Sequence, residues 1–257
     1  MLNNLISTKL PPEHIADKIK TLDMTAEINQ LITHLGAQST FATAQSRRAA
    51  IMNITNLHTG TITLHSTSIA NISIKTLTPE TISSPLYSVP GQSIVFAVDR
   101  PFKVQRYTLT SHQLEKSDVV IIDKNNPLII DGSRTVFDYL PLDLEPGGLM
   151  GRINWPDRSA DISVFHRVSL RKVAWLPHDE SAARYLVSLE LLETIEDPER
   201  TRVAEELVYH YHPAVAWKAF QMLYQADPQI ALNYVPLLKK HQDTRLDNLL
   251  SPLEKAA

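Results

Sequence analysis

Cysteine is absent from this 257-residue chain, and glycine occurs only seven times. Without cysteine there is no disulfide, no thiolate nucleophile, no zinc–thiolate site and no iron–sulfur cluster. The few glycines do not form a Gly-x-x-x-x-Gly-Lys phosphate loop, and none lies in the strand-to-helix turn of a dinucleotide-binding site. Ser133 also lacks the flanking glycines of a Gly-x-Ser-x-Gly nucleophile elbow. The sequence therefore carries no signature of these common enzyme classes.

Long apolar runs and an excess of basic charge are missing as well. No apolar stretch approaches the ~20 residues that a membrane-spanning helix needs. Residues 1–7 lack the basic and then apolar order of a signal peptide. The formal net charge is −3, whereas a protein that follows nucleic-acid phosphates normally carries a basic excess. We therefore expect a cytoplasmic protein that binds neither membranes nor nucleic acid.

Residues 1–47 are predicted to form a helical lead. Pro11-Pro12 before Glu13 is a favourable helix start, because proline lacks only an amide hydrogen that would have no partner there. A second helix is predicted from about residue 23, with an apolar stripe at Ile28, Leu31, Ile32 and Leu35 that ends at Gly36.

Residues 48–178 are predicted to form a β domain. Their runs are rich in isoleucine, threonine and serine, and β-branched side chains pack better on a pleated sheet than on a helix. Residues 141–161 contain several prolines and glycines and read as an irregular connector. Many short strands at near-regular spacing favour an antiparallel β-sandwich or barrel. The predicted strands cover residues 51–57, 61–67, 69–74, 93–98, 103–109, 119–123, 127–130 and 162–175, the last as one long strand or a bent pair.

Residues 179–257 are predicted to be helical throughout. Asp197-Pro198 and Asp227-Pro228 lie thirty residues apart, and each pair lies between two amphipathic segments. Aspartate is a good N-cap and proline suits the first helical turn, so each pair marks the start of a helix. The overall prediction is an α+β protein with an N-terminal helical lead, a β-sandwich or barrel and a C-terminal helical repeat module.

Two family resemblances extend this prediction. The phrase from His212-Pro213 to Ala219 resembles the helix openings of HEAT-type repeats, in which a turn proline precedes small residues at close-packing positions. That resemblance implies a surface for protein binding. The strand region is similar to a cupin-type barrel in strand number and turn spacing, although the cupin metal-binding signature is missing.

The helical region supplies the candidate binding residues. Tryptophan, tyrosine and arginine contribute most of the energy at protein interfaces. We therefore expect a patch that binds a protein partner, formed by Arg184, Arg202, Tyr209, Tyr211 and an exposed Trp217. The alternative role for the tryptophans is to fill the seam between sheet and helices.

Histidines of the strand region supply the alternative site. His58 and His65 lie on either side of a predicted hairpin tip and could form a three-histidine site with His112 or His166. The dyad His210-x-His212 lies at a helix junction, where the two rings are not expected to share a metal. The favoured function is thus non-enzymatic protein interaction or regulation, with no cofactor. The alternative is a small-molecule-binding or divalent-metal-dependent enzyme with its site inside the β domain, which a polar interior would favour.

Overall fold

The computed structural model describes residues 2–7, 10–56, 60–77, 85–140 and 148–254. The chain divides into two compact units. The first, here the β unit, comprises Met1–Leu109 and Glu115–Asp157, and the second, here the helical unit, comprises Thr110–Leu114 and Arg158–Ala257. Helices and antiparallel strands occur together, which confirms the predicted α+β class. No helix in the described ranges combines the length and the apolar character needed to cross a membrane.

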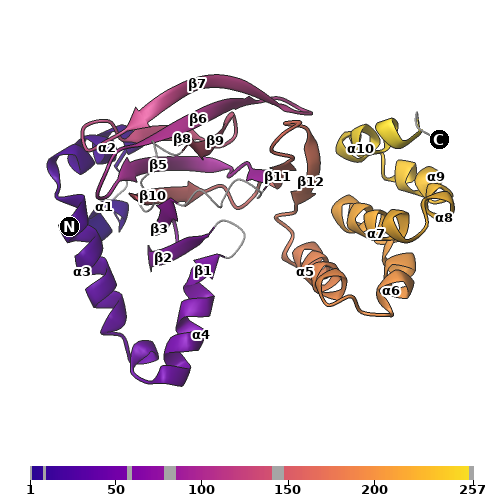
Figure 1. Cartoon of the computed structure of the whole chain (residues 1–257), viewed down its shortest axis with the longest axis horizontal. Coiled ribbons are helices and arrows are strands. Elements are labelled where there is room, and N and C mark those ends of the chain that lie inside the picture. The colour runs from indigo at the N-terminus through magenta and orange to yellow at the C-terminus, as the bar shows by residue number, and fades with distance from the viewer. Residues whose placement is uncertain (1, 8–9, 57–59, 78–84, 141–147, 255–257) are drawn as a thin grey trace. The chain divides into compact units, whose positions relative to one another are not determined.

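The β unit contains two antiparallel sheets (Figure 1). A further short strand is β4 (Leu86–Tyr87). The smaller sheet has the order β7 (Leu114–Ile122), β6 (Phe102–Leu109), β9 (Thr135–Leu140). The larger sheet has the order β1 (Thr55–Asn56), β2 (Thr61–Ser66), β3 (Asn71–Leu77), β10 (Gly148–Pro156), β5 (Gly91–Ala97), β8 (Leu128–Asp131).

Each face of the larger sheet has its own core. Alternate residues of a strand point to opposite faces, so Ile72 and Ile94 face one side while Ser73 and Val95 face the other. The first face packs against the helices α1 (Leu2–Ser7), α2 (Pro12–Thr21) and α3 (Met24–Gly36). The second face shares a core with the smaller sheet, in which Val95 and Met150 join Phe102 and Val104. The β unit is therefore a sandwich of two sheets with a helical layer on one outer face.

The structure corrects several strand assignments made from the sequence. Strand β9 was not predicted, and two other regions were assigned wrongly. Residues 44–54 form helix α4 (Ala44–Ile54), where a strand was predicted from residue 51. Thr43 and Ser46 form a capping box that satisfies the first amides of this helix. The connector predicted from residue 141 contains β10, which pairs with β3 on one side and β5 on the other. A Cβ atom at Gly151 would lie 2.1 Å from the Phe96 ring, so glycine permits close packing there rather than ending the strand.

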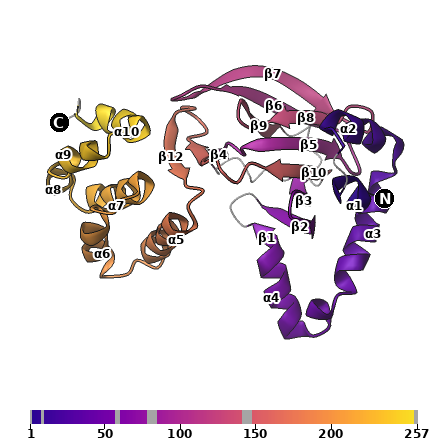
Figure 2. The ribbon, with the colours of Figure 1, turned by 180° about the vertical axis from the view of Figure 1, so that it is seen from behind.

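The helical unit contains a β-hairpin. Of the two forms predicted for residues 162–175, one long strand or a bent pair, the structure has the bent pair. Strands β11 (Ile162–Phe165) and β12 (Lys172–Leu176) pair antiparallel, and Leu170 adopts a positive φ of 58° in their turn. Six helices follow (Figure 1 and Figure 2), along with a 3₁₀ turn at Lys239–His241. The six are α5 (Glu180–Thr194), α6 (Arg200–Leu207), α7 (Pro213–Ala226), α8 (Pro228–Leu232), α9 (Val235–Leu238) and α10 (Thr244–Glu254).

The predicted capping role of the Asp-Pro pairs is confirmed for Asp227-Pro228 but wrong for Asp197-Pro198, because α6 begins at Arg200 with Glu199 as its N-cap. Asp227 accepts hydrogen bonds from the amides of Gln229 and Ile230 at the start of α8. Asp197 accepts one from Glu199, one residue before α6. Helix α7 is the centre of this unit and packs against α5, α6 and α8. Its alanines 214, 216 and 219 are buried, which lets neighbouring helices approach closely.

Candidate functional site

The residues predicted to bind a partner lie on three helices and a turn of the helical unit. Arg184 lies on α5, Arg202 on α6 and Trp217 on α7, while Tyr209 and Tyr211 lie in the turn between α6 and α7. Both tyrosines are exposed. Arg202 is exposed as well, but its guanidinium already pairs with Glu199 at 2.6 Å and Glu206 at 2.8 Å. Its charge is therefore largely neutralised within its own helix.

Trp217 does not belong to the exposed patch, contrary to the sequence prediction. Only 6% of its surface is exposed, and its indole Nε1 donates a 3.1 Å hydrogen bond to the Val173 carbonyl. The ring stacks on Phe220, with centroids 5.5 Å apart. Trp217 instead packs helix α7 against strand β12, which matches the alternative seam-filling role.

The exposed tyrosines are held in place by contacts with their neighbours. The His210 ring lies between Tyr185, at 4.8 Å, and Tyr211, at 4.5 Å. The Tyr211 hydroxyl donates a 3.0 Å hydrogen bond to Asp179, which also accepts the amides of Ser181 and Ala182 and so caps α5. Burial lowers the pKa of His210, which favours its neutral form. The rings of Tyr185, His210 and Tyr211 are thereby held next to the start of α5.

Helix α5 carries a second exposed feature that the sequence prediction missed. Val187, Leu191 and Ile195 expose 65%, 58% and 58% of their surface. Val187 and Leu191 lie on α5 and Ile195 is its C-cap residue; at intervals of four residues, the three form one stripe along the helix. Leu186 and Leu189 lie on the opposite side of α5 and are buried in the core shared with α7. Plotting α5 as a helical wheel would have revealed two apolar faces, but not which of them the fold covers.

The metal site predicted from histidines finds no support among the described residues. His58 lies outside them. His65 lies on β2, His112 in the helical unit, and His166 accepts a hydrogen bond from the amide of Ser169 in the β11–β12 turn. In the ranges that the structure describes, no group of three histidine, aspartate or glutamate side chains is placed to hold a metal ion. His212 instead caps α7, with its Nδ1 3.2 Å from the Ala214 amide nitrogen.

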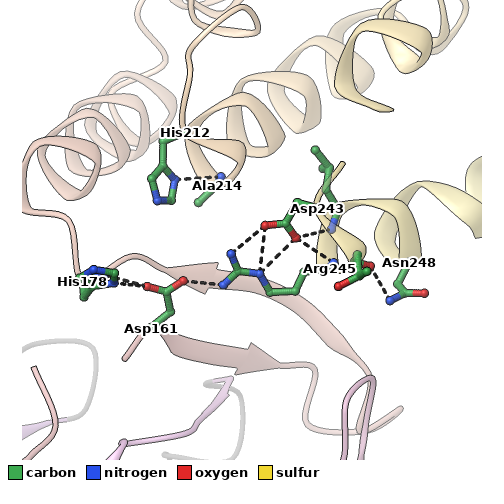
Figure 3. Close-up of polar contacts among 9 residues, drawn as sticks. Asp161, His178, His212, Ala214, Asp243, Arg245 and Asn248 are labelled. Atoms are coloured by element: carbon green, nitrogen blue, oxygen red, sulfur yellow. Dashed lines mark hydrogen bonds and ion pairs between the residues drawn. The ribbon is translucent and has the colours of Figure 1, made fainter. Parts of the chain in front are cut away.

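Figure 3 shows a network of charged side chains within the helical unit. Asp161 accepts the His178 amide at 3.0 Å and also pairs with Arg245. Arg245 pairs in turn with Asp243, at 2.8 Å, and its guanidinium lies 4.7 Å from the centre of the Trp175 ring. Burial acts to raise the pKa of both aspartates, but the hydrogen bonds from His178 to Asp161 and from Arg245 to both outweigh it and hold each pKa below its ordinary value. The charges satisfy one another, and the network fastens α10 to the hairpin.

Comparisons with known proteins add little to this picture. No family model and no curated protein matches the chain. Two similar solved structures are a hydroquinone 1,2-dioxygenase in complex with Cd²⁺ and 4-hydroxybenzonitrile, and the hydroquinone 1,2-dioxygenase from Sphingomonas sp. TTNP3 with 4-hydroxybenzoate bound.

The two likenesses are weak in every respect. Sequence identity is 6% and 11%, and the TM-scores are 0.31 and 0.29. Each match covers 37% of this chain, and the chain spans 63% and 64% of the length of those two proteins. At TM-scores this low the likeness establishes neither a common fold nor a common activity.

Proposed function

We propose that this chain is a non-enzymatic protein-interaction or regulatory protein whose partner docks on helix α5. The observation that carries the proposal is the exposed stripe of Val187, Leu191 and Ile195. A surface helix normally has one apolar face, turned toward the core, and a polar face toward water. Helix α5 has an apolar stripe on its outer side as well, and contiguous exposed apolar surface marks interaction sites.

The partner that fits this surface is an amphipathic helix. Helix α5 is the first helix of the helical unit, and its inner side packs against α6 and α7. In stacked helical arrays the terminal helix needs a polar outer face, because no further helix covers it. The outer side of α5 carries the apolar stripe in addition to polar side chains, and residues four apart form the ridge that fits into the grooves of a second helix.

The residues around the stripe suit a binding rim. Arg184 lies on the same side of α5, three residues before Val187, and its side chain is exposed. Tyr185 and Tyr211 are held by the contacts with His210, so they lose little conformational entropy when a partner binds. Fixed tyrosines and an exposed arginine are the residue types that contribute most at interfaces.

Leu191→Glu tests the proposal, with Ser188→Glu as the matched control. Both changes place a glutamate on the exposed side of α5, but only the first interrupts the apolar stripe. The tagged full-length chain and both variants are used to capture proteins from cells of the source organism, with quantitative mass spectrometry. We expect at least one protein that the wild type and Ser188→Glu capture in similar amounts. Leu191→Glu should capture less of it by about tenfold or more, which is the effect of removing a single interface hot spot.

Two further measurements show whether the loss of capture comes from unfolding of the variant or from indirect binding. The free energy of unfolding of Leu191→Glu should differ from that of the wild type by no more than about 0.5 kcal/mol, because the replaced side chain is already exposed. The captured protein, once purified, should bind the wild type directly. If no captured protein depends on Leu191, or if Ser188→Glu loses it equally, α5 is not the docking surface.

A further inference from the structure

Helix α5 presents an outer side that can match a copy of itself. Its apolar stripe, formed by Val187, Leu191 and Ile195, has an arginine at one end and a glutamate at the other. Arg184 lies three residues before the stripe, Glu196 follows it directly, and both side chains are exposed. A surface with opposite charges at its two ends is complementary to a second copy that runs in the opposite direction, which is the arrangement that a two-fold axis produces.

Neither of these two charges is paired within its own chain. In the part of the chain that the structure describes, Arg184 and Glu196 form no ion pair. The neighbouring carboxylates are occupied, because Glu193 pairs with Lys218 at 2.6 Å and Glu199 pairs with Arg202 at 2.6 Å. Glu196 is therefore a carboxylate at the end of α5 that remains available to a cation from another molecule.

A single position of the two-fold axis pairs both sets of charges. Residue 190 is the midpoint between residues 184 and 196. At a rise of about 1.5 Å per residue, both charges lie about 9 Å from this midpoint along the helix, in opposite directions. When two antiparallel copies of α5 meet at this level, Arg184 of each copy lies next to Glu196 of the other.

The apolar side chains interdigitate in the same register. Along the helix, Val187 lies about 4.5 Å before the midpoint, and Leu191 and Ile195 lie about 1.5 and 7.5 Å after it. The two-fold axis reverses these positions in the second copy. Side chains from the two copies therefore alternate along the contact about every 3 Å, with the two Leu191 side chains in the centre. Ridges of residues four apart pack between each other in this way when two helices cross.

We propose that the partner of α5 is a second copy of this chain, and that two α5 helices pack antiparallel in a two-fold symmetric dimer. This inference rests on the proposed docking role of α5 and names the molecule that occupies it. A copy of α5 supplies the apolar ridge, the carboxylate for Arg184 and the cation for Glu196. One pair of helices makes a small interface, and small interfaces are typically weak and transient, so we expect a dissociation constant in the micromolar range.

Sedimentation equilibrium of the full-length protein tests the inference. The measurements cover about 1 to 100 µM protein at low ionic strength, where exposed charges are least screened. We expect the wild type to form a dimer as its concentration rises. Arg184→Glu and Glu196→Arg should each raise the dissociation constant about tenfold or more, because the symmetric dimer contains the charge pair twice and both pairs become like-charged.

A mixture of the two variants gives the decisive readout. In a dimer of Arg184→Glu with Glu196→Arg, opposite charges face each other at both ends of the contact, so an equimolar mixture should dimerise about as well as the wild type. Lys240→Glu is the matched control for Arg184→Glu. Lys240 is exposed in the 3₁₀ turn, outside α5, and its replacement changes the net charge by the same amount, so the dissociation constant should stay unchanged.

The outcomes separate this inference from the proposed function. A wild type that stays monomeric at about 100 µM overturns the second-copy assignment, whereas the docking role of α5 is decided by the capture experiment with Leu191→Glu. A dimer that both charge reversals leave unchanged forms through another surface and overturns the inference as well. Loss of the dimer in both variants without recovery in the mixture contradicts the pairing of Arg184 with Glu196. A variant that folds poorly cannot produce that recovery, so recovery supports the inference directly.

Discussion

Asp161 joins three parts of the helical unit through one carboxylate. It accepts hydrogen bonds from the His178 backbone and from Arg245, and it lies just before β11. Such a group contributes to stability in a way that depends on pH, because its pKa in the folded chain is below that in the unfolded chain.

We expect Asp161→Asn to lower the free energy of unfolding by about 1–3 kcal/mol at pH 7, the range for hydrogen bonds to a charged group. Above the unfolded-state pKa of about 3.9 the stabilisation by the carboxylate is fully present, and it is lost as the pH falls through the lower folded-state pKa. The difference in the free energy of unfolding between wild type and Asp161→Asn should therefore decrease from pH 7 to pH 3, as measured by urea unfolding.

Asp247→Asn is the control for this prediction. Asp247 lies in the first turn of α10 and is exposed, so its replacement should change stability by no more than about 0.5 kcal/mol. If the free energies of unfolding of wild type and Asp161→Asn differed by the same amount at pH 7 and at pH 3, the assigned role of the carboxylate would be contradicted.

Helix α4 is weakly attached to the rest of the chain. None of its residues is buried, and Ile51 and Met52 are exposed. Short helices without tertiary packing are only marginally stable in water. In hydrogen-exchange mass spectrometry we expect the amides of α4 to exchange about 100-fold faster or more than those of α7, whose eight buried residues hold it in the core. Equal protection of the two helices would show that α4 is covered in solution.

Helices and strands differ in how well the sequence predicted them. Helices α2, α3 and α7 were predicted because a proline or an aspartate marks each start and a single apolar stripe follows. Strand β10 was missed because its glycines and proline resemble loop residues. It is defined by pairing with β3 and β5, which are far away in the sequence.

For the candidate sites too, the sequence alone did not predict which side chains the packing buries. Tyr209 and Tyr211 are exposed as predicted, whereas Trp217 is buried, because only the arrangement of α7 against β12 decides which aromatic rings the core covers. The exposed stripe on α5 was not predicted either, because it depends on which side of the helix the fold leaves uncovered, and no local pattern in the sequence records that.

The whole molecule contains separate cores in its two units. The core of the helical unit is formed entirely by residues from 175 onward, and the two cores of the β unit lie within residues 2–155. Differential scanning calorimetry should therefore resolve two unfolding transitions. Trp217→Phe removes the hydrogen bond to Val173 and should shift only one of them, by roughly 4–8 °C for each kcal/mol lost. A single transition that moves as a whole in this variant would show that the units unfold together.

The central claim is that helix α5 docks a partner through its outer apolar stripe. The most direct test is the affinity of the purified partner for Leu191→Glu and for Ser188→Glu, measured side by side. We predict a dissociation constant at least about tenfold weaker for Leu191→Glu, a loss of ~1.4 kcal/mol or more, and a value near that of the wild type for Ser188→Glu. Equal affinities for the two variants would contradict the claim.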